Sequence, residues 1–231
     1  MKAFYILICL NALLLNECIS QNDCSNLFTF NTDSSFEMSA YGTTNNLLSV
    51  TNYEVSHIRQ TLNGKTAFLS AVNRDVSKKR DTLEQENYEI ECTSKSVVLN
   101  HRNVVPAFLY DEYSNLEFDI SKIALVVPKN LEIGQSLDDA VLEIDILATP
   151  IKHRITYLLK DRCVTATETI TTPAGTFNCI IIESKTSMKP QNENAGFVKH
   201  WFAEGVGFIK QVDYNKKGQV SSVNILTELQ L

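Results

Sequence analysis

Alternation of apolar and polar residues with a period of two dominates this 231-residue chain. In residues 142–146 two carboxylates separate three large aliphatic side chains, and similar runs occupy residues 67–72, 88–92, 151–159 and 223–229. Successive side chains of an extended strand point to opposite faces, so this pattern predicts strands with one buried and one hydrated face. Antiparallel sheets have such strands, and we therefore expect a mainly β fold.

Turn-forming residues divide these runs at short intervals. They occur at residues 42–46, 62–65, 173–175 and 215–218. Asparagine and glycine adopt the positive φ angles that tight hairpin turns require, and proline presets φ for a turn. Because hairpins place consecutive strands side by side, we expect the strands to form a meander.

Residues 103–115 break the alternation. The segment begins with an asparagine and carries Pro106 early, which together are a signal for the start of a helix. Phe108, Leu109 and Tyr113 then fall near one side of a helical wheel. The sequence predicts one short helix here.

The first twenty residues have the layout of a secretory signal peptide. Lys2 is followed by an apolar run over residues 3–15, which is too short for a transmembrane helix of about 20 residues. The alternative, a buried N-terminal helix, is less favoured because the run has almost no polar face. We expect cleavage after Ser20 and a single mature domain, residues 21–231, without a transmembrane segment.

Cys18 raises the question of a lipid anchor. Lipid attachment requires small residues just before the cysteine, and Asn16 and Glu17 stand there instead. The sequence therefore predicts an exported, periplasmic or extracellular product that is not lipid-anchored. Its net charge of −6 and the absence of a long basic run argue against nucleic acid and anionic membrane surfaces as partners.

Four cysteines remain after the predicted cleavage, and export makes disulfides feasible. A tight turn at residues 173–175 would place Cys163 on the order of 20 Å from Cys179, beyond the reach of a disulfide. We expect a Cys24–Cys92 bridge. The alternative is that all four cysteines are small buried residues.

Motifs of catalytic and metal sites are absent from the sequence. There is no phosphate-binding loop, dinucleotide fingerprint, nucleophile elbow or HExxH motif. The four histidines, His57, His101, His153 and His200, lack the close spacing of metal ligands and are expected to be core or edge residues with satisfied hydrogen bonds. We expect a protein that is not an enzyme and needs neither cofactor nor metal.

Several segments resemble one family in order and spacing. They are TPAGTFNC at residues 172–179, KHWFAEGVGFIKQ at 199–211, DYNKKGQV at 213–220, and Pro128 with the residues that follow it to 137. Together these resemble the TapB-like family of exported bacterial proteins, which has no established activity. The resemblance covers most of the mature chain and is strongest over residues 160–231.

The cysteines follow the same resemblance in part. Cys24 and Cys92 match the family's early cysteines and Cys179 its later one, whereas Cys163 departs from the pattern. The family is similar to half-barrel envelope domains of the LolA, LolB and LppX type. This implies a curved antiparallel meander sheet with the short helix covering its concave face, a likeness of fold that carries no function by itself.

Two hypotheses of function remain. In the first, the concave face binds a lipid or another apolar small molecule, with Phe108, Leu109, Tyr113 and Trp201 as ligand-binding residues. In the second, the chain is a non-catalytic structural or protein-interaction domain of the cell envelope. The second hypothesis predicts a solid core and an exposed edge strand or apolar patch that contacts an envelope protein.

Overall fold

The computed structural model describes most of the chain after the predicted signal peptide. Residues 1–20, the expected cleavage site and Cys24 lie outside the described residues, so the predictions made for them stay predictions. The described ranges are 27–28, 31–76, 82–112, 117–123, 125–148, 151–190 and 193–231.

Strands account for nearly all regular structure in the described residues. The first seven are β1 (Ser35–Tyr41), β2 (Leu47–Thr61), β3 (Gly64–Asp75), β4 (Thr82–Thr93), β5 (Ser96–Asn100), β6 (Glu117–Ile123) and β7 (Leu125–Pro128). The other seven are β8 (Ser136–Leu137), β9 (Ala140–Ala148), β10 (Ile151–Thr172), β11 (Gly175–Lys189), β12 (Glu193–Ala203), β13 (Gly207–Tyr214) and β14 (Val220–Gln230).

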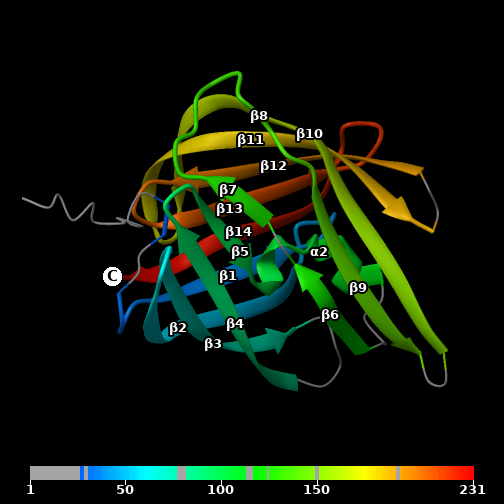
Figure 1. Ribbon diagram of the computed structural model, residues 1–231. Helices are drawn as coiled ribbons and strands as arrows, with labels where there is room; N and C mark the ends of the chain where they lie inside the picture. Colours follow the sequence, from blue (N-terminus) through cyan, green and yellow to red (C-terminus); the bar gives the residue numbers. More distant parts are fainter. Residues whose placement is uncertain are drawn as a thin grey trace, which may run out of the picture.

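All of these strands belong to one antiparallel sheet (Figure 1). Its hydrogen-bonded path runs β6-β9-β10-β11-β12-β13-β14-β1-β2-β3-β4-β5-β7, and β8 pairs with β10 beside this path. Within the described residues the path is not closed, and β6 and β7 form its two ends. The prediction of a mainly β, antiparallel fold is confirmed, and most consecutive strands are neighbours as a meander requires.

The four predicted turns all connect adjacent strands. Residues 42–46 join β1 to β2, residues 62–63 join β2 to β3, residues 173–174 join β10 to β11, and residues 215–219 join β13 to β14. A further turn follows β12, where we expected only a bend within one strand. Gly205 there has a φ of 74°, a value that glycine adopts without strain.

The predicted helix is present but interrupted. A 3-10 turn, η1 (Arg102–Val104), precedes the helix α2 (Ala107–Glu112), and residues 113–115 of the predicted helix lie outside the described residues. Val105 between them is extended, with φ −80° and ψ 132°. The following Pro106 disfavours helical geometry at Val105, which explains the interruption.

The alternation correctly marks the buried face of several strands. Ala67, Leu69 and Ala71 of β3 are buried, as are Leu142 and its two alternate neighbours in β9. Asp145 is a correction: we expected it on a hydrated face, yet it is only 1% exposed. The guanidinium of Arg154 covers it, with Nε donating to Oδ1 at 2.8 Å.

The pattern is reversed in β14. Val223 and Ile225 were expected to be on the buried face, but they are half-buried, whereas Ser222 and Asn224 lie inside. Asn224 Nδ2 donates to the carbonyls of Asn103 and Val105, at 2.9 and 3.3 Å. This side chain therefore attaches the η1–α2 segment to the inner face of the sheet, and the bonds offset the cost of burying an amide.

One buried arginine links β7, at one end of the sheet path, to β10, near the other end. Arg162 of β10 donates from Nη2 to the carbonyl of Val126 in β7 at 2.9 Å, and from Nη1 to the carbonyl of Asp138 at 2.7 Å. Burial lowers the pKa of Arg162 to about 10, so it stays charged at neutral pH. The bonds hold β7, and with it the β7–β8 loop, close to β10.

The two cysteines of the C-terminal half are free thiols. Cys179 pairs with Glu168 in the β10–β11 register, whereas Cys163 pairs with Glu183. The predicted separation of the two cysteines is therefore confirmed. Cys92 is buried in the core. The Cys24–Cys92 bridge stays a prediction because Cys24 lies outside the described residues.

Candidate functional site

The residues that we expected to bind a ligand stay a prediction, because no ligand contact is described for them. Leu109 is completely buried, Phe108 is half-buried, and Tyr113 lies outside the described residues. Trp201 is also buried, and it belongs with Leu109 to the main hydrophobic core, against which Phe108 packs.

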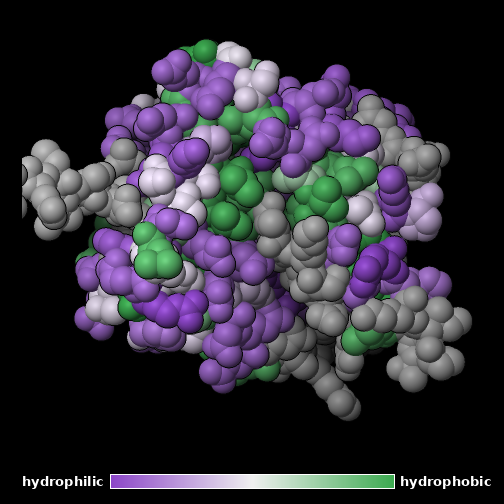
Figure 2. Space-filling view, viewed as in Figure 1, coloured by the Kyte–Doolittle hydropathy of each residue, from purple (hydrophilic) through white to green (hydrophobic). Residues whose placement is uncertain are grey.

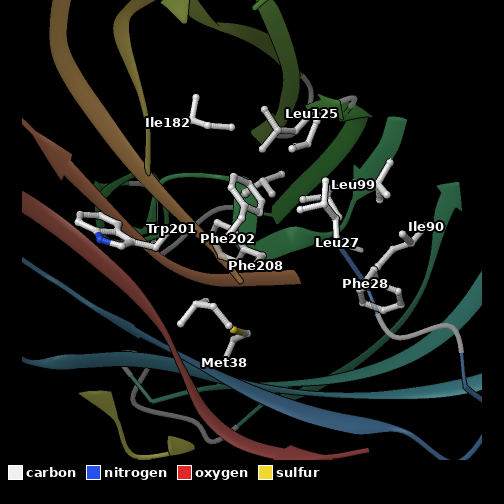
Figure 3. Close-up of a cluster of buried hydrophobic side chains, with 14 of the residues drawn as sticks. Leu27, Phe28, Met38, Ile90, Leu99, Leu125, Ile182, Trp201, Phe202 and Phe208 are labelled. Atoms are coloured by element: carbon white, nitrogen blue, oxygen red, sulfur yellow. The ribbon is translucent and has the colours of Figure 1, made fainter. Parts of the chain in front are cut away.

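Trp201 is 6% exposed and belongs to the same buried cluster as Phe202 and Phe208. Phe202 and Phe208 do pack together, with ring centroids 5.7 Å apart, but the ring of Trp201 lies to one side of them (Figure 3). Its Nε1 donates to Glu168 Oε2 at 2.8 Å, and Lys210 Nζ lies 5.2 Å from the ring centroid. The buried Trp201 thus fixes the carboxylate of Glu168.

The interior between β10 and β13 holds a hydrogen-bonded polar cluster. Asp213 accepts from Tyr157, Gln211 and Ser222, the shortest of these bonds being 2.8 Å from Ser222 Oγ. Burial raises the pKa of Asp213 to about 6, although the three donors oppose the shift. None of these side chains lines either of the large grooves described below, so the cluster has a structural role.

Two histidines are buried inside, as the sequence suggested, but without full hydrogen bonding. Within the described residues His101 Nδ1 and His200 Nε2 have no partner, which corrects the expectation of satisfied histidines. Burial lowers the pKa of His101 to about 4 and that of His200 to about 3, and the charge of Arg162 adds to the second shift. Both rings are neutral, and no cluster of metal-binding side chains occurs in the described residues.

A small cavity of about 10 Å³, about the minimum for one water molecule, lies at the apolar end of the interior in the described part of the chain. Its walls come from the N-terminal segment, β1, β5, β13 and β14: Phe28, Phe36, Leu99, His101, Val206, Phe208, Leu226 and Leu229.

A groove of about 540 Å³ opens beside the distal half of β10, and we call it the β10 groove. Volumes of 300–1,000 Å³ are typical of ligand sites. The lining combines apolar residues with a polar rim: Leu27, Lys129, Asn130, Leu131, Glu132, Thr167, Glu168, Thr169, Asn178, Cys179, Ile180, Phe202 and Glu204.

The β10 wall of this groove is a strand edge that has no partner strand among the described residues. β9 pairs with β10 over residues 151–159 and β8 pairs with it at residues 162–163, whereas β11 covers the other side as far as Thr172. No described strand pairs with the first side over residues 165–172. Most side chains of that stretch are exposed.

Acidic residues dominate the rim of the β10 groove. Glu132, Glu168 and Glu204 are exposed there, and Lys129 is the basic residue of the lining. Cys179 also lines the groove, but burial raises the pKa of its thiol to about 11, so it is not a reactive thiolate. The acidic rim suits binding of a partner with complementary charge.

A second groove of similar volume, about 540 Å³, lies over β1 and β2 next to the β10–β11 turn. Glu37, Glu54 and Glu228 line it together with small polar side chains. Pro173 and Ala174 of the turn form one side. It lacks the bare strand edge of the β10 groove.

Sequence reasoning missed the β10 groove, although it singled out the segments that form it. Asn178 and Cys179 come from one of the quoted motifs, Phe202 and Glu204 from another, and Leu131 from the segment after Pro128. The motifs were interpreted as turns and bends. The signal that could have led to the site is their convergence, which only the strand order reveals.

The surface beside the groove is otherwise hydrophilic. On the face that carries β7 and the β7–β8 loop, apolar side chains reach the surface mainly near the middle, around β7 (Figure 2). Val126 of β7 is 40% exposed. None of the helices in the described part of the chain is long and apolar enough to cross a membrane.

A family model described as DUF3108-like matches residues 32–226, which include every strand named above except the last residues of β14. The chain belongs to the DUF3108-like family. The match covers the β10 groove apart from Leu27. None of the curated proteins is significantly similar to this DUF3108-like chain.

Two crystal structures have a similar fold. One, described as an exported protein with a YmcC-like fold from Bacteroides fragilis, has a TM-score of 0.74 at 17% identity, covering 90% of this chain and 100% of the other. The second, described as a lipoprotein from Parabacteroides distasonis, has a TM-score of 0.70 at 21% identity with the same coverage, 90% and 100%. At these identities the likeness concerns the fold.

Proposed function

We propose that this DUF3108-like protein is an exported, non-catalytic protein-interaction module of the bacterial cell envelope, and that its contact surface is the β10 groove. The observation that carries the proposal is the bare edge of β10 over residues 165–172, bordered by that groove. An exposed edge presents unpaired backbone groups that favour pairing with another chain. The descriptions of the two structural neighbours support export.

The same geometry favours a protein partner over a lipid bound inside. The cavity at the apolar end has a volume of about 10 Å³, far below the range of 300–1,000 Å³ for small-molecule sites. Between β10 and β13 the inside is polar, with Asp213 and Gln211 both buried. An apolar ligand at the concave face would have to displace well-packed side chains.

The proposal also includes the detailed shape of the fold, a family relation and the mature form of the chain. A curved half-barrel like those of LolA and LppX, with α2 covering its concave face, fits the attachment of the η1–α2 segment to Asn224. A relation to the TapB-like family fits the motifs that converge on the groove. Cleavage after Ser20 and the absence of a lipid anchor complete the proposed mature form.

Site-specific photo-crosslinking in whole cells tests the contact surface. A photoreactive amino acid replaces Glu204, which lines the groove, or Leu83, which is 70% exposed on β4 and serves as the matched control. We expect an adduct with one identifiable envelope protein from position 204 and none from position 83. Equal labelling at both positions, or none at either, contradicts the proposal.

Native mass spectrometry of protein from its own host separates the two hypotheses. We expect the mass of the polypeptide alone, because the cavity described at the apolar end, about 10 Å³, is far too small for a lipid. A stoichiometric lipid adduct would favour the apolar-ligand hypothesis instead.

A further inference from the structure

The hairpin geometry determines which backbone groups face the free edge of β10. A two-residue turn joins β10 and β11, so its flanking residues, Thr172 and Gly175, form a hydrogen-bonded pair. From there the residue pairs between β10 and β11 alternate between hydrogen-bonded and non-hydrogen-bonded pairs. Thr171, Thr169 and Thr167 therefore lie at positions that are not hydrogen-bonded to β11. Their N–H and C=O groups point toward the β10 groove side.

The chain's own residues already pair with this edge, up to the point where the groove begins. Val164 N donates to the carbonyl of Gln135 at 2.9 Å, and Gly134 N donates to the carbonyl of Val164 at 2.7 Å. Gly134 has a φ of 90°, and the loop before it lies on the opposite side of the groove. The ladder on this edge therefore ends at Val164, and the next positions have the same geometry without a described partner.

The shape of the groove selects a single strand as occupant. Leu27 and the loop residues Lys129–Glu132 face the β10 edge across the groove. A folded domain or a second copy of this chain would meet that loop before reaching the edge. An extended peptide is narrow enough to lie between them, and recognition by strand addition needs only main-chain bonds and pockets for alternate side chains.

The side chains of the groove define the chemistry of that strand. Leu131, Ile180 and Phe202 offer apolar contacts, which suit every second side chain of the peptide. Glu132, Glu168 and Glu204 give the rim a negative potential, in keeping with the chain's net charge of −6. Basic side chains at the alternate positions complement this rim and speed association.

We infer that the β10 groove binds an extended peptide segment with alternating apolar and basic side chains, which adds a strand to β10 alongside Thr167, Thr169 and Thr171. The inference rests on the proposed function and specifies its partner. It makes the interaction depend on backbone amides of β10, a dependence that a contact through side chains alone would not show.

Fluorescence anisotropy with synthetic peptides tests both parts of the inference. The probe is a fluorescein-labelled ten-residue peptide of alternating lysine and valine, and the matched control alternates glutamate and valine. We expect the lysine peptide to bind at least about tenfold more tightly at low salt. Equal affinity of the two peptides overturns the charge complementarity.

Two substitutions at one position test strand addition. Thr169→Pro removes an amide that faces the groove without removing a bond to β11, whereas Thr169→Val keeps the amide and removes the hydroxyl. We expect the proline variant to weaken binding of the lysine peptide about tenfold, the effect of one lost main-chain bond, while the valine variant retains it. Circular dichroism verifies that both variants are folded.

The outcome also distinguishes this inference from the proposed function. An adduct from position 204 in cells, together with unchanged peptide binding by Thr169→Pro, overturns strand addition and leaves the interaction module standing. Loss of the adduct in cells contradicts the proposed function, whichever peptide binds.

Discussion

The two halves of β10 behave as two different strands. Residues 156–159 and Cys163 are paired on both sides, by β9 or β8 and by β11, and this half of the strand sends Tyr157 and Arg162 into the interior. Residues 165–172 are paired on one described side, and most of their side chains, largely threonines, are exposed. Figure 1 shows both halves in one long strand that bends around the molecule with β11.

The difference shows how one strand can combine stability with binding. We call the half of β10 before Val164 the covered half. Hydrogen bonds to neighbouring strands stabilise it, together with the bonds of Arg162 to β7 and to the segment before β9. We call residues 165–172 the bare half. Its outward N–H and C=O groups have no partner strand among the described residues, whereas natural sheets usually block such edges with charges, prolines or bulges. A bulge between Val164 and Ala166 separates the two halves.

A proline in the covered half has the largest expected effect. Leu158 pairs with Val141 on one side and Ser187 on the other, so Leu158→Pro removes a ladder bond whichever way its amide points. We expect a loss of about 3 kcal/mol or more in the free energy of unfolding, by analogy with proline in other regular elements. Urea denaturation measures it. A midpoint equal to that of the wild type would contradict two-sided pairing.

Loss of Arg162 comes next. Arg162→Ala leaves the carbonyls of Val126 and Asp138 without their buried donor, and each such loss costs about 1–3 kcal/mol. We expect a clear decrease in the urea midpoint. The control is Lys185→Ala, which removes a solvent-exposed ion pair with Asp161 and should leave the midpoint unchanged. Similar midpoints for both variants would show that the arginine does not link β7 to β10.

Asp213 gives the covered half a pH dependence. Its pKa is raised from 3.8 to about 6, so the folded state holds a proton that the unfolded state releases between these values. The contribution of Asp213 to the free energy of unfolding therefore falls by about 3 kcal/mol in total as the pH rises from 4 to 6. Neutral, buried His101 and His200 act in the opposite direction over the same range, because the unfolded state protonates them.

Comparison with Asp213→Asn isolates this contribution from that of the histidines. We expect the wild type to lose stability relative to the variant as pH rises from 4 to 6, measured by urea denaturation at each pH. A constant difference between the two proteins across this range would mean that the pKa of Asp213 is not raised.

The bare half should tolerate what the covered half does not. Thr169→Pro removes no bond to a described strand, so we expect its free energy of unfolding to change by less than about 1 kcal/mol. The same urea experiment that detects Leu158→Pro measures it. Equal destabilisation by the two prolines would erase the proposed difference between the halves.

The sequence predicts hairpins better than it predicts which face is inside. Gly, Asn and Pro restrict φ locally, so the turns at residues 62–65 and 173–175 could be found without knowing the fold. Alternation separates two faces of a strand but does not orient them. Ser222 and Asn224 lie inside because bonds to Asp213 and to the η1–α2 segment satisfy them, and those partners are distant in sequence.

The β10 groove could not be predicted from the sequence for a similar reason. An edge exists only when no neighbour covers it, and the described partner of this edge ends where Ser136 of β8 pairs with Cys163 and Gly134 bonds to Val164. Nothing in the threonine-rich residues 165–172 indicates that their partner ends there. Trp201 was chosen as an anchor because of its type, whereas the structure buries it opposite Ile181 with its Nε1 bonded to Glu168.

Amide hydrogen exchange, read residue by residue, tests the central claim most directly. In the free protein we expect amides of the covered half that bond to β9 to exchange slowly and those of Thr167, Thr169 and Thr171 to exchange fast. The lysine–valine peptide should slow the second group specifically. Slow exchange of these three amides in the free protein, or no change on adding saturating peptide, would contradict the claim that the bare edge of β10 is a binding surface.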